Sequence, residues 1–61
     1  MNIMSKTKAK QLEKEHKAVF SNQIVNKDEQ AYRVFSIKGK IDFYYYPITE
    51  TEAWGIVHNK G

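Results

Sequence analysis

Three tyrosines of this 61-residue chain are spaced so that they could act together on one surface. Tyr44 and Tyr46 lie two residues apart in an aromatic run, and Tyr32 lies in the apolar segment before it. Side chains two residues apart on a β-strand point to the same face of a sheet. Such a face could stack on the bases of a nucleic acid or anchor a protein interface, where tyrosine is enriched. If the face assignment is inverted, the same rings would belong to the core instead.

Three acidic residues could complement a basic partner. Asp42 lies inside an expected strand, where it could meet a partner's cation, pair with a cross-strand cation or protect the strand against aggregation. Glu50 and Glu52 lie in an expected loop of a chain too small for the cleft that paired glycosidase carboxylates need. We interpret them as solubilising charges or as an acidic tip. Asp42, Glu50 and Glu52 therefore join the three tyrosines as predicted partner-binding residues.

Four lysines form a second candidate surface. Lys6, Lys10, Lys14 and Lys17 follow one another at helical spacing and would form one positive stripe. The stripe could hold a phosphate backbone, or it could be the solvated side of an amphipathic helix. Together with Tyr44 and Tyr46, these lysines are the predicted contacts if the ligand is a nucleic acid.

Residue types that usually carry catalysis or bind metals are scarce. The chain has no cysteine and two histidines, and no acid or nucleophile is placed beside His16 or His58 by a recognisable spacing. We expect no catalytic residues, no metal site and no cofactor, and hence a protein that is not an enzyme.

The elements that would position these residues follow from periodicity and turn residues. The expected elements are a helix over 5–22, a short strand at 23–25, a turn at 26–30, and strands over 31–37, 41–46 and 53–57. Ser5 is the expected N-cap of the helix, and Gly39 can adopt positive φ in the connection before the second long strand. Pro47 should end that strand, because proline cannot donate a ladder hydrogen bond. The predicted fold class is α+β, with one N-terminal helix packed on a three- to four-stranded antiparallel meander.

The expected core lies between the helix and one face of the sheet. The helix would contribute Leu12, His16, Val19 and Phe20, and the sheet Phe35, Ile37, Ile41, Phe43, Tyr45, Trp54 and Ile56. The other face would expose Tyr32, Val34, Tyr44, Tyr46 and Val57. So much exposed aromatic surface needs an explanation, such as a partner or a homodimer.

Length and charge set the broad class. A chain of 61 residues forms one small domain of marginal stability, and we expect residues 1–4 and 59–61 to fray. The net charge is +3, and all of the excess lies in residues 1–17. No signal peptide or apolar run of membrane-spanning length is present, so we expect a cytoplasmic protein without membrane contact.

The hairpin region resembles a family of short phage and prophage accessory proteins. The residues that carry the resemblance are Ile37-Lys38-Gly39-Lys40-Ile41-Asp42-Phe43, then Tyr46-Pro47-Ile48-Thr49, then Trp54, which together follow an I-D-F-Y-P-x-T…W pattern. Two tyrosines are inserted before Tyr46, and the connection before Trp54 is longer than the usual Thr-Gly-Lys turn.

The resemblance implies a viral accessory protein in the cytoplasm of a bacterial host. Such proteins often bind and inhibit a host protein, including defence nucleases, so the leading hypothesis is an anti-CRISPR-like inhibitor. The alternative hypothesis is a small nucleic-acid-binding protein that combines the lysine-rich helix with the aromatic sheet face.

Overall fold

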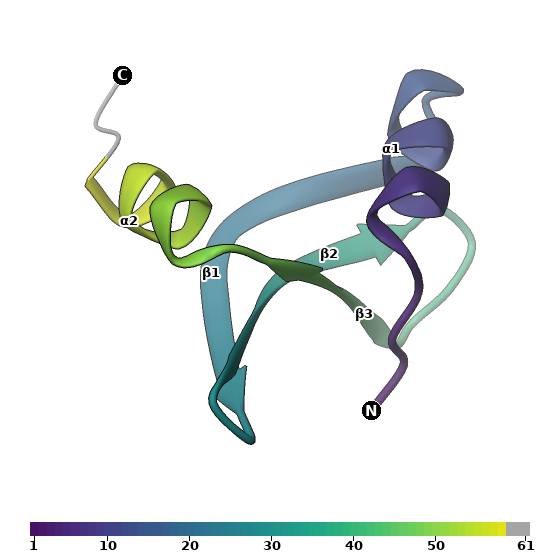
Figure 1. The fold of residues 1–61 in the computed structure, drawn as a ribbon. Coiled ribbons are helices and arrows are strands. Elements are labelled where there is room, and N and C mark those ends of the chain that lie inside the picture. Colours follow the sequence, from purple (N-terminus) through teal and green to yellow (C-terminus); the bar gives the residue numbers. More distant parts are fainter. Residues whose placement is uncertain (59–61) are drawn as a thin grey trace.

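The computed structural model describes residues 1–58 and confirms the α+β class. The elements are α1 (Lys6–Lys14), β1 (Ala18–Lys27), β2 (Gln30–Ile37), β3 (Phe43–Ile48) and α2 (Glu50–His58). The strands form one antiparallel sheet in the order β1-β2-β3. Both helices lie on the same side of this sheet (Figure 1).

Helix α1 begins where the sequence predicted, but it ends eight residues before the predicted end at residue 22. The Ser5 hydroxyl accepts a hydrogen bond from the backbone N–H of Lys8 at 3.2 Å, as an N-cap does. The helix ends at Lys14, and His16 follows in the left-handed conformation at φ 62°. The expected helix over 5–22 is therefore wrong in its second half. Val19 and Phe20 belong to β1, which suits β-branched and aromatic side chains.

Strands β1 and β2 form the longest hairpin. The predicted turn is confirmed at Asp28 and Glu29, which have φ of 51° and 65° between the paired residues Lys27 and Gln30. Two positive φ values in a two-residue loop match the type I′ turn, whose twist fits antiparallel strands. The register shifts between Phe20 and Ile24, which marks a bulge in β1.

Strand β3 is shifted toward the C-terminus relative to the prediction. Gly39 has the expected positive φ of 81°, but the strand begins at Phe43 rather than Ile41 and continues through Pro47 to Ile48. Pro47 is tolerated because β3 is at the edge of the three-stranded sheet. The N–H of Tyr45 points away from β2, toward the edge of the sheet. The nitrogen of Pro47, two residues later, points the same way, so no hydrogen bond to β2 is lost.

Residues 1–4, which the sequence predicted to fray, are hydrogen-bonded along this edge. The N–H of Tyr45 donates to the carbonyl oxygen of Asn2 at 2.8 Å. The N–H of Met4 donates to the carbonyl oxygen of Tyr45 at 2.9 Å. Ile3 forms an isolated parallel bridge with Tyr45. The other segment expected to fray, 59–61, lies outside the described residues.

The strand predicted over 53–57 is instead helix α2. Its N-terminus is a capping box: the Thr49 hydroxyl accepts from the N–H of Glu52, and the Glu52 carboxylate accepts from the N–H of Thr49, both at 3.1 Å. These reciprocal bonds satisfy two backbone N–H donors at the helix start. The sequence Thr49-Glu50-Thr51-Glu52 therefore starts a helix, where we expected a loop.

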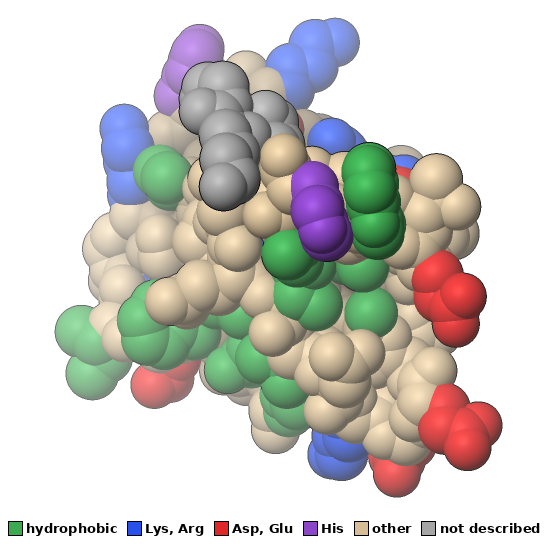
Figure 2. Space-filling view, turned by 90° about the vertical axis from the view of Figure 1, so that its left-hand side faces the viewer, with side chains coloured by type: hydrophobic (Ala, Val, Ile, Leu, Met, Phe, Trp, Pro, Cys, Tyr) green, Lys and Arg blue, Asp and Glu red, His purple; other side chains and the backbone are tan. Residues whose placement is uncertain are grey.

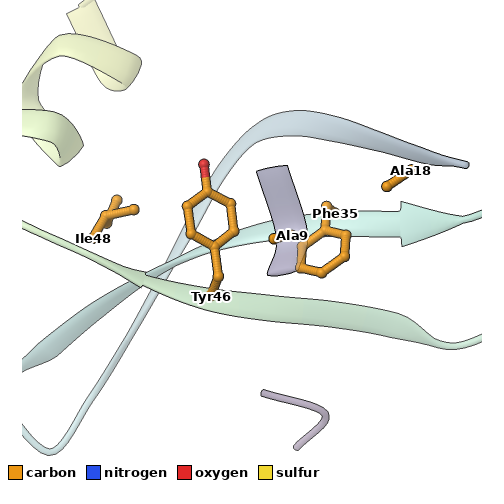
Figure 3. Packing of buried hydrophobic residues seen from close by; sticks show 5 residues of the cluster. All are labelled: Ala9, Ala18, Phe35, Tyr46 and Ile48. Carbon is orange, nitrogen blue, oxygen red and sulfur yellow. The ribbon is translucent and has the colours of Figure 1, made fainter. Parts of the chain in front are cut away.

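The core lies between the two helices and one face of the sheet. Its buried cluster consists of Ala9, Ala18, Phe35, Tyr46 and Ile48 (Figure 3). Helix α1 adds Leu12, and α2 adds Ala53 and Ile56. The β3 face was predicted the wrong way round: Tyr44 and Tyr46 pair with Phe35 and Arg33 on the core side.

Candidate functional site: the open face of the sheet

The side of the sheet that faces away from both helices carries mostly apolar residues. We call this surface the open face and define it by Ile3, Val19, Val25, Tyr32, Val34, Phe43, Tyr45 and Pro47. Cross-strand pairs place these side chains together: Val19 and Phe43 flank Ser36, and Tyr32 lies between Val25 and Pro47. Tyr45 pairs with Val34 on one side and bridges to Ile3 on the other.

The open face is exposed at its edges and closely packed at its centre. Val34 is buried, yet it is not part of the cluster that packs under the helices. Val19 and Phe43 are 59% and 60% exposed, and Ile3 is also exposed. In the loop before β3, Ile41 is a further apolar side chain and is 99% exposed. An apolar surface of this extent on a small domain is typical of an interaction site.

The three predicted tyrosines do not share a surface, which corrects the sequence analysis. Tyr32 lies on the open face, whereas Tyr46 is 2% exposed within the core and contacts Phe20 at a ring-centroid distance of 5.1 Å. Tyr44 is half-buried beside Phe35 at 5.9 Å. Tyr46 therefore cannot present its ring to a partner, for either a protein interface or base stacking.

The predicted acidic residues also have separate environments. Asp42 is exposed in the loop beside Phe43, at the rim of the open face. Glu50 is exposed at the start of α2. Glu52 is already engaged by Thr49 and by Lys6, whose Nζ lies 2.5 Å from a Glu52 carboxylate oxygen. The hydrogen bond from Lys6 is the main reason why the pKa of Glu52 lies below its usual value.

The lysine stripe follows α1 only in part. Lys6, Lys10 and Lys14 lie on the helix, while Lys17 lies beyond its end and contacts Glu15 at 3.2 Å. That contact also holds the pKa of Glu15 below its usual value, mainly through a hydrogen bond. Since α1 packs on the core side of the sheet, Lys6, Lys10 and Lys14 lie on the opposite side of the sheet from the open face.

A second apolar surface lies on the side formed by α2 and β1. It is a groove of about 420 Å³ lined by Ile24, Asn26, Ala31, Glu50, Ala53, Trp54, Val57 and His58. Figure 2 shows hydrophobic side chains gathered on this side of the molecule. His58 stacks on Trp54 at a centroid distance of 4.3 Å, and this pairing gives the histidine a structural contact on the helix surface.

Sequence reasoning missed six members of the open face: Ile3, Val19, Val25, Phe43, Tyr45 and Pro47. The alternation of β3 was ambiguous, because both of its sides carry aromatic residues. Ile48 was a usable signal, since a strand that includes it places Tyr44, Tyr46 and Ile48 on one strongly apolar side.

Within residues 1–58, no three side chains of the metal-binding types gather into a site for an ion. None of the helices in this part of the chain is long and apolar enough to cross a membrane. No known protein family, curated protein or solved structure matches the sequence or the fold.

Proposed function

We propose that this protein is a small non-enzymatic binding module of the phage accessory type, which docks a host protein through the open face. The observation that carries the proposal is the apolar composition of a sheet face that neither helix covers. An antiparallel sheet with one face in water normally alternates apolar and polar residues. An uncovered face that is apolar as well is best explained by a surface that becomes buried in a complex.

The residues of the open face suggest how the partner is held. Tyr32, Phe43 and Tyr45 are aromatic side chains on a rigid sheet, the kind of residue that anchors protein interfaces. Asp42 adds a negative charge at the rim, next to Phe43. The partner would therefore present an apolar patch beside a lysine or arginine. A host defence nuclease such as a CRISPR effector has a basic nucleic-acid groove, whose cations Asp42 could complement.

The proposal can be tested with purified, guide-loaded CRISPR effector nucleases. Binding and DNA cleavage are measured with the wild-type protein and with Phe43→Ser, Val19→Ser and Val57→Ser. Val19 and Val57 form a matched pair, because they are 59% and 61% exposed and only Val19 lies on the open face. Loss of the Phe43 anchor should weaken binding about tenfold or more. Val19→Ser should weaken it less, and Val57→Ser should bind as the wild type does.

Other results would change the assignment. If Val57→Ser weakened binding as much as Val19→Ser, the partner would lie on the α2 side and the open face would not be the site. If no nuclease bound and sedimentation showed a stable dimer that Phe43→Ser dissociates, the open face would belong to a second copy of this chain. The homodimer considered from the sequence is thus one outcome of the same experiment.

Nucleic-acid binding is the second candidate, and one observation favours it. Tyr32, Phe43 and Tyr45 share the open face, and Lys38 and Lys40 lie in the loop that precedes β3. Rings on a sheet with flanking lysines can stack on single-stranded bases. The lysines of α1 cannot assist, because they lie on the other side of the sheet, and this is why we place the protein partner first.

A salt titration separates the two candidates. Binding of single-stranded DNA or RNA through lysines should weaken steeply as salt is added, and Tyr45→Ala should weaken it further. Absence of binding at low salt would exclude this candidate. Binding that Tyr45→Ala leaves unchanged would exclude the open face as the stacking surface.

A further inference from the structure

A polar groove between α1 and α2 lies on the opposite side of the sheet from the open face. Its volume is about 250 Å³, and its lining residues are Lys10, Asn22, Arg33, Tyr46, Glu52, Gly55 and Ile56. The ion pair between Lys6 and Glu52 joins the two helices beside it. The groove is distinct from the apolar one beside α2, which shares none of these lining residues.

A tyrosine hydroxyl that has no partner among residues 1–58 opens into this groove. The ring of Tyr46 is buried against Phe20 and Phe35, and its hydroxyl points away from β3 (Figure 3). No hydrogen bond to this hydroxyl is formed by residues 1–58. No polar side-chain atom of these residues is both sealed from solvent and unpaired, so the hydroxyl is accessible from the groove. A buried tyrosine usually directs its hydroxyl at a partner, and here the groove is where one could bind.

Two cations line the groove, and neither forms an ion pair among residues 1–58. The Lys10 ammonium and the Arg33 guanidinium carbon each lie 5.4 Å from the centre of the Phe20 ring. Arg33 is held in place because Nε donates to the Ser21 carbonyl oxygen at 2.8 Å and Nη2 to the Asn22 side-chain oxygen at 3.2 Å. These two bonds leave further guanidinium N–H groups free.

The one carboxylate of the groove is already satisfied. One oxygen of Glu52 accepts from Lys6, and the other accepts from the backbone N–H and the hydroxyl of Thr49. The groups that remain are donors: the Lys10 ammonium, free N–H groups of Arg33, the Tyr46 hydroxyl and the amide nitrogen of Asn22, whose oxygen is taken by Arg33. A site rich in donors fits a ligand that only accepts hydrogen bonds.

We propose that this groove binds a phosphate-sized oxyanion, held by Lys10 and Arg33 with a hydrogen bond from the Tyr46 hydroxyl. The anion is either a free phosphate or the phosphate of a small ester, because both present the same oxygen atoms. The open edge of the groove between the helices leaves room for the remainder of an ester.

The test is an NMR titration of the 61-residue protein with inorganic phosphate, and separately with a simple phosphate monoester, at constant ionic strength maintained with sodium chloride. Binding should give saturable shifts of the Arg33 Nε–H, the Asn22 side-chain amide and the Gly55 backbone amide. The monoester tells the two sources apart, since an ester site should bind it at least as tightly as free phosphate.

Three variants locate the site. Lys10→Gln should weaken phosphate binding about tenfold, the size expected for loss of one charge-assisted contact. Tyr46→Phe keeps the ring in the core and removes only the hydroxyl, so it should weaken binding severalfold. Lys14→Gln removes the same charge from α1 outside the groove lining and should bind as the wild type does.

The proposal is overturned if shifts are weak, do not saturate and are reproduced by chloride alone. It is also overturned if Lys14→Gln weakens binding as much as Lys10→Gln, because that would indicate general attraction to a basic helix. Thermal unfolding of each variant checks that it is folded. If Lys10→Gln does not fold, Tyr46→Phe still tests the site, and unchanged phosphate binding by this variant would overturn the role of the hydroxyl.

Discussion

Two phenylalanines, Phe35 and Phe43, have opposite roles in the same sheet. Phe35 is 1% exposed beneath the helices and contacts the rings of Phe20, Tyr44 and Tyr46. Phe43 is 60% exposed on the open face. The two side chains are chemically identical. If their replacement affects stability or binding differently, the cause is therefore the side of the sheet on which each one lies.

Replacing each phenylalanine by alanine should separate folding from binding. Phe35→Ala should lower the free energy of unfolding by about 3–5 kcal/mol, because it leaves a cavity at the centre of the core. Phe43→Ala should lower it by less than about 1 kcal/mol, since most of the ring is in water. Urea unfolding followed by circular dichroism measures both. Similar losses for the two variants would show that the open face belongs to the core.

Glu52 should make stability depend on pH. Its carboxylate is held by Lys6 and Thr49, so its pKa in the folded state is lower than the usual value of 4.5. A depressed pKa contributes stability above the unfolded-state value, and this contribution is lost as the pH falls through the folded-state value. Urea midpoints measured from neutral to acidic pH should therefore decrease on acidification.

The control for this prediction is a pair of glutamine variants on the same helix. In Glu52→Gln the urea midpoint should decrease less on acidification than in the wild type. In Glu50→Gln it should decrease as much as in the wild type. An unchanged profile in Glu52→Gln would mean that other carboxylates cause the acid sensitivity.

At the scale of elements, the β1–β2 turn contains local strain that a substitution can relieve. Glu29 has φ of 65° without being glycine or asparagine, the residues that type I′ turns favour. Glu29→Gly should raise the free energy of unfolding by roughly 0.5–1 kcal/mol, because glycine adopts positive φ without a steric cost. Thermal unfolding measures the change.

Glu13→Gly is the control for Glu29→Gly, because it places glycine at a position with helical φ. Glu13→Gly lies within α1 and should lower the free energy of unfolding by about 1 kcal/mol. If both variants were destabilised equally, the flexibility of glycine in the unfolded chain would outweigh the relief of strain in the turn.

Helix α2 shows why the sequence predicted a strand where the C-terminal residues form a helix. Trp54, Ile56 and Val57 have side chains that also favour strands, and their spacing predicted a strand over 53–57. The capping box at Thr49 and Glu52 decides the local conformation, since it satisfies the helix start before the apolar residues begin. Packing of Ala53 and Ile56 on the core cluster then holds the helix in place.

At the scale of the whole molecule, a chain of 61 residues should have a free energy of unfolding of roughly 3–9 kcal/mol. Both helices contact one core cluster, so we expect a single cooperative transition. Fluorescence of Trp54 reports on α2, and far-ultraviolet circular dichroism reports on the entire backbone. The two probes should give the same urea midpoint. An earlier Trp54 transition would show that α2 unfolds separately from the sheet.

Local chemistry was sufficient to predict some of this structure from the sequence. The Ser5 N-cap, the polar turn around Asp28, strand β2 and the positive φ of Gly39 each depend on neighbouring residues alone, and all are confirmed. The α+β class followed from the same signals. The sequence also predicted that one sheet face would carry more apolar surface than a monomer needs to expose.

Which residues form that face was decided by tertiary structure. Tyr44 and Tyr45 differ by one position in a run of three tyrosines, and alternation alone does not say which of them faces the helices. The register of β3 against β2 places Tyr44 opposite Phe35 on the core side, and Tyr45 therefore lies opposite Val34 on the other side. Register is a relation between distant segments, so only the folded chain determines which aromatic side chains are left for a partner.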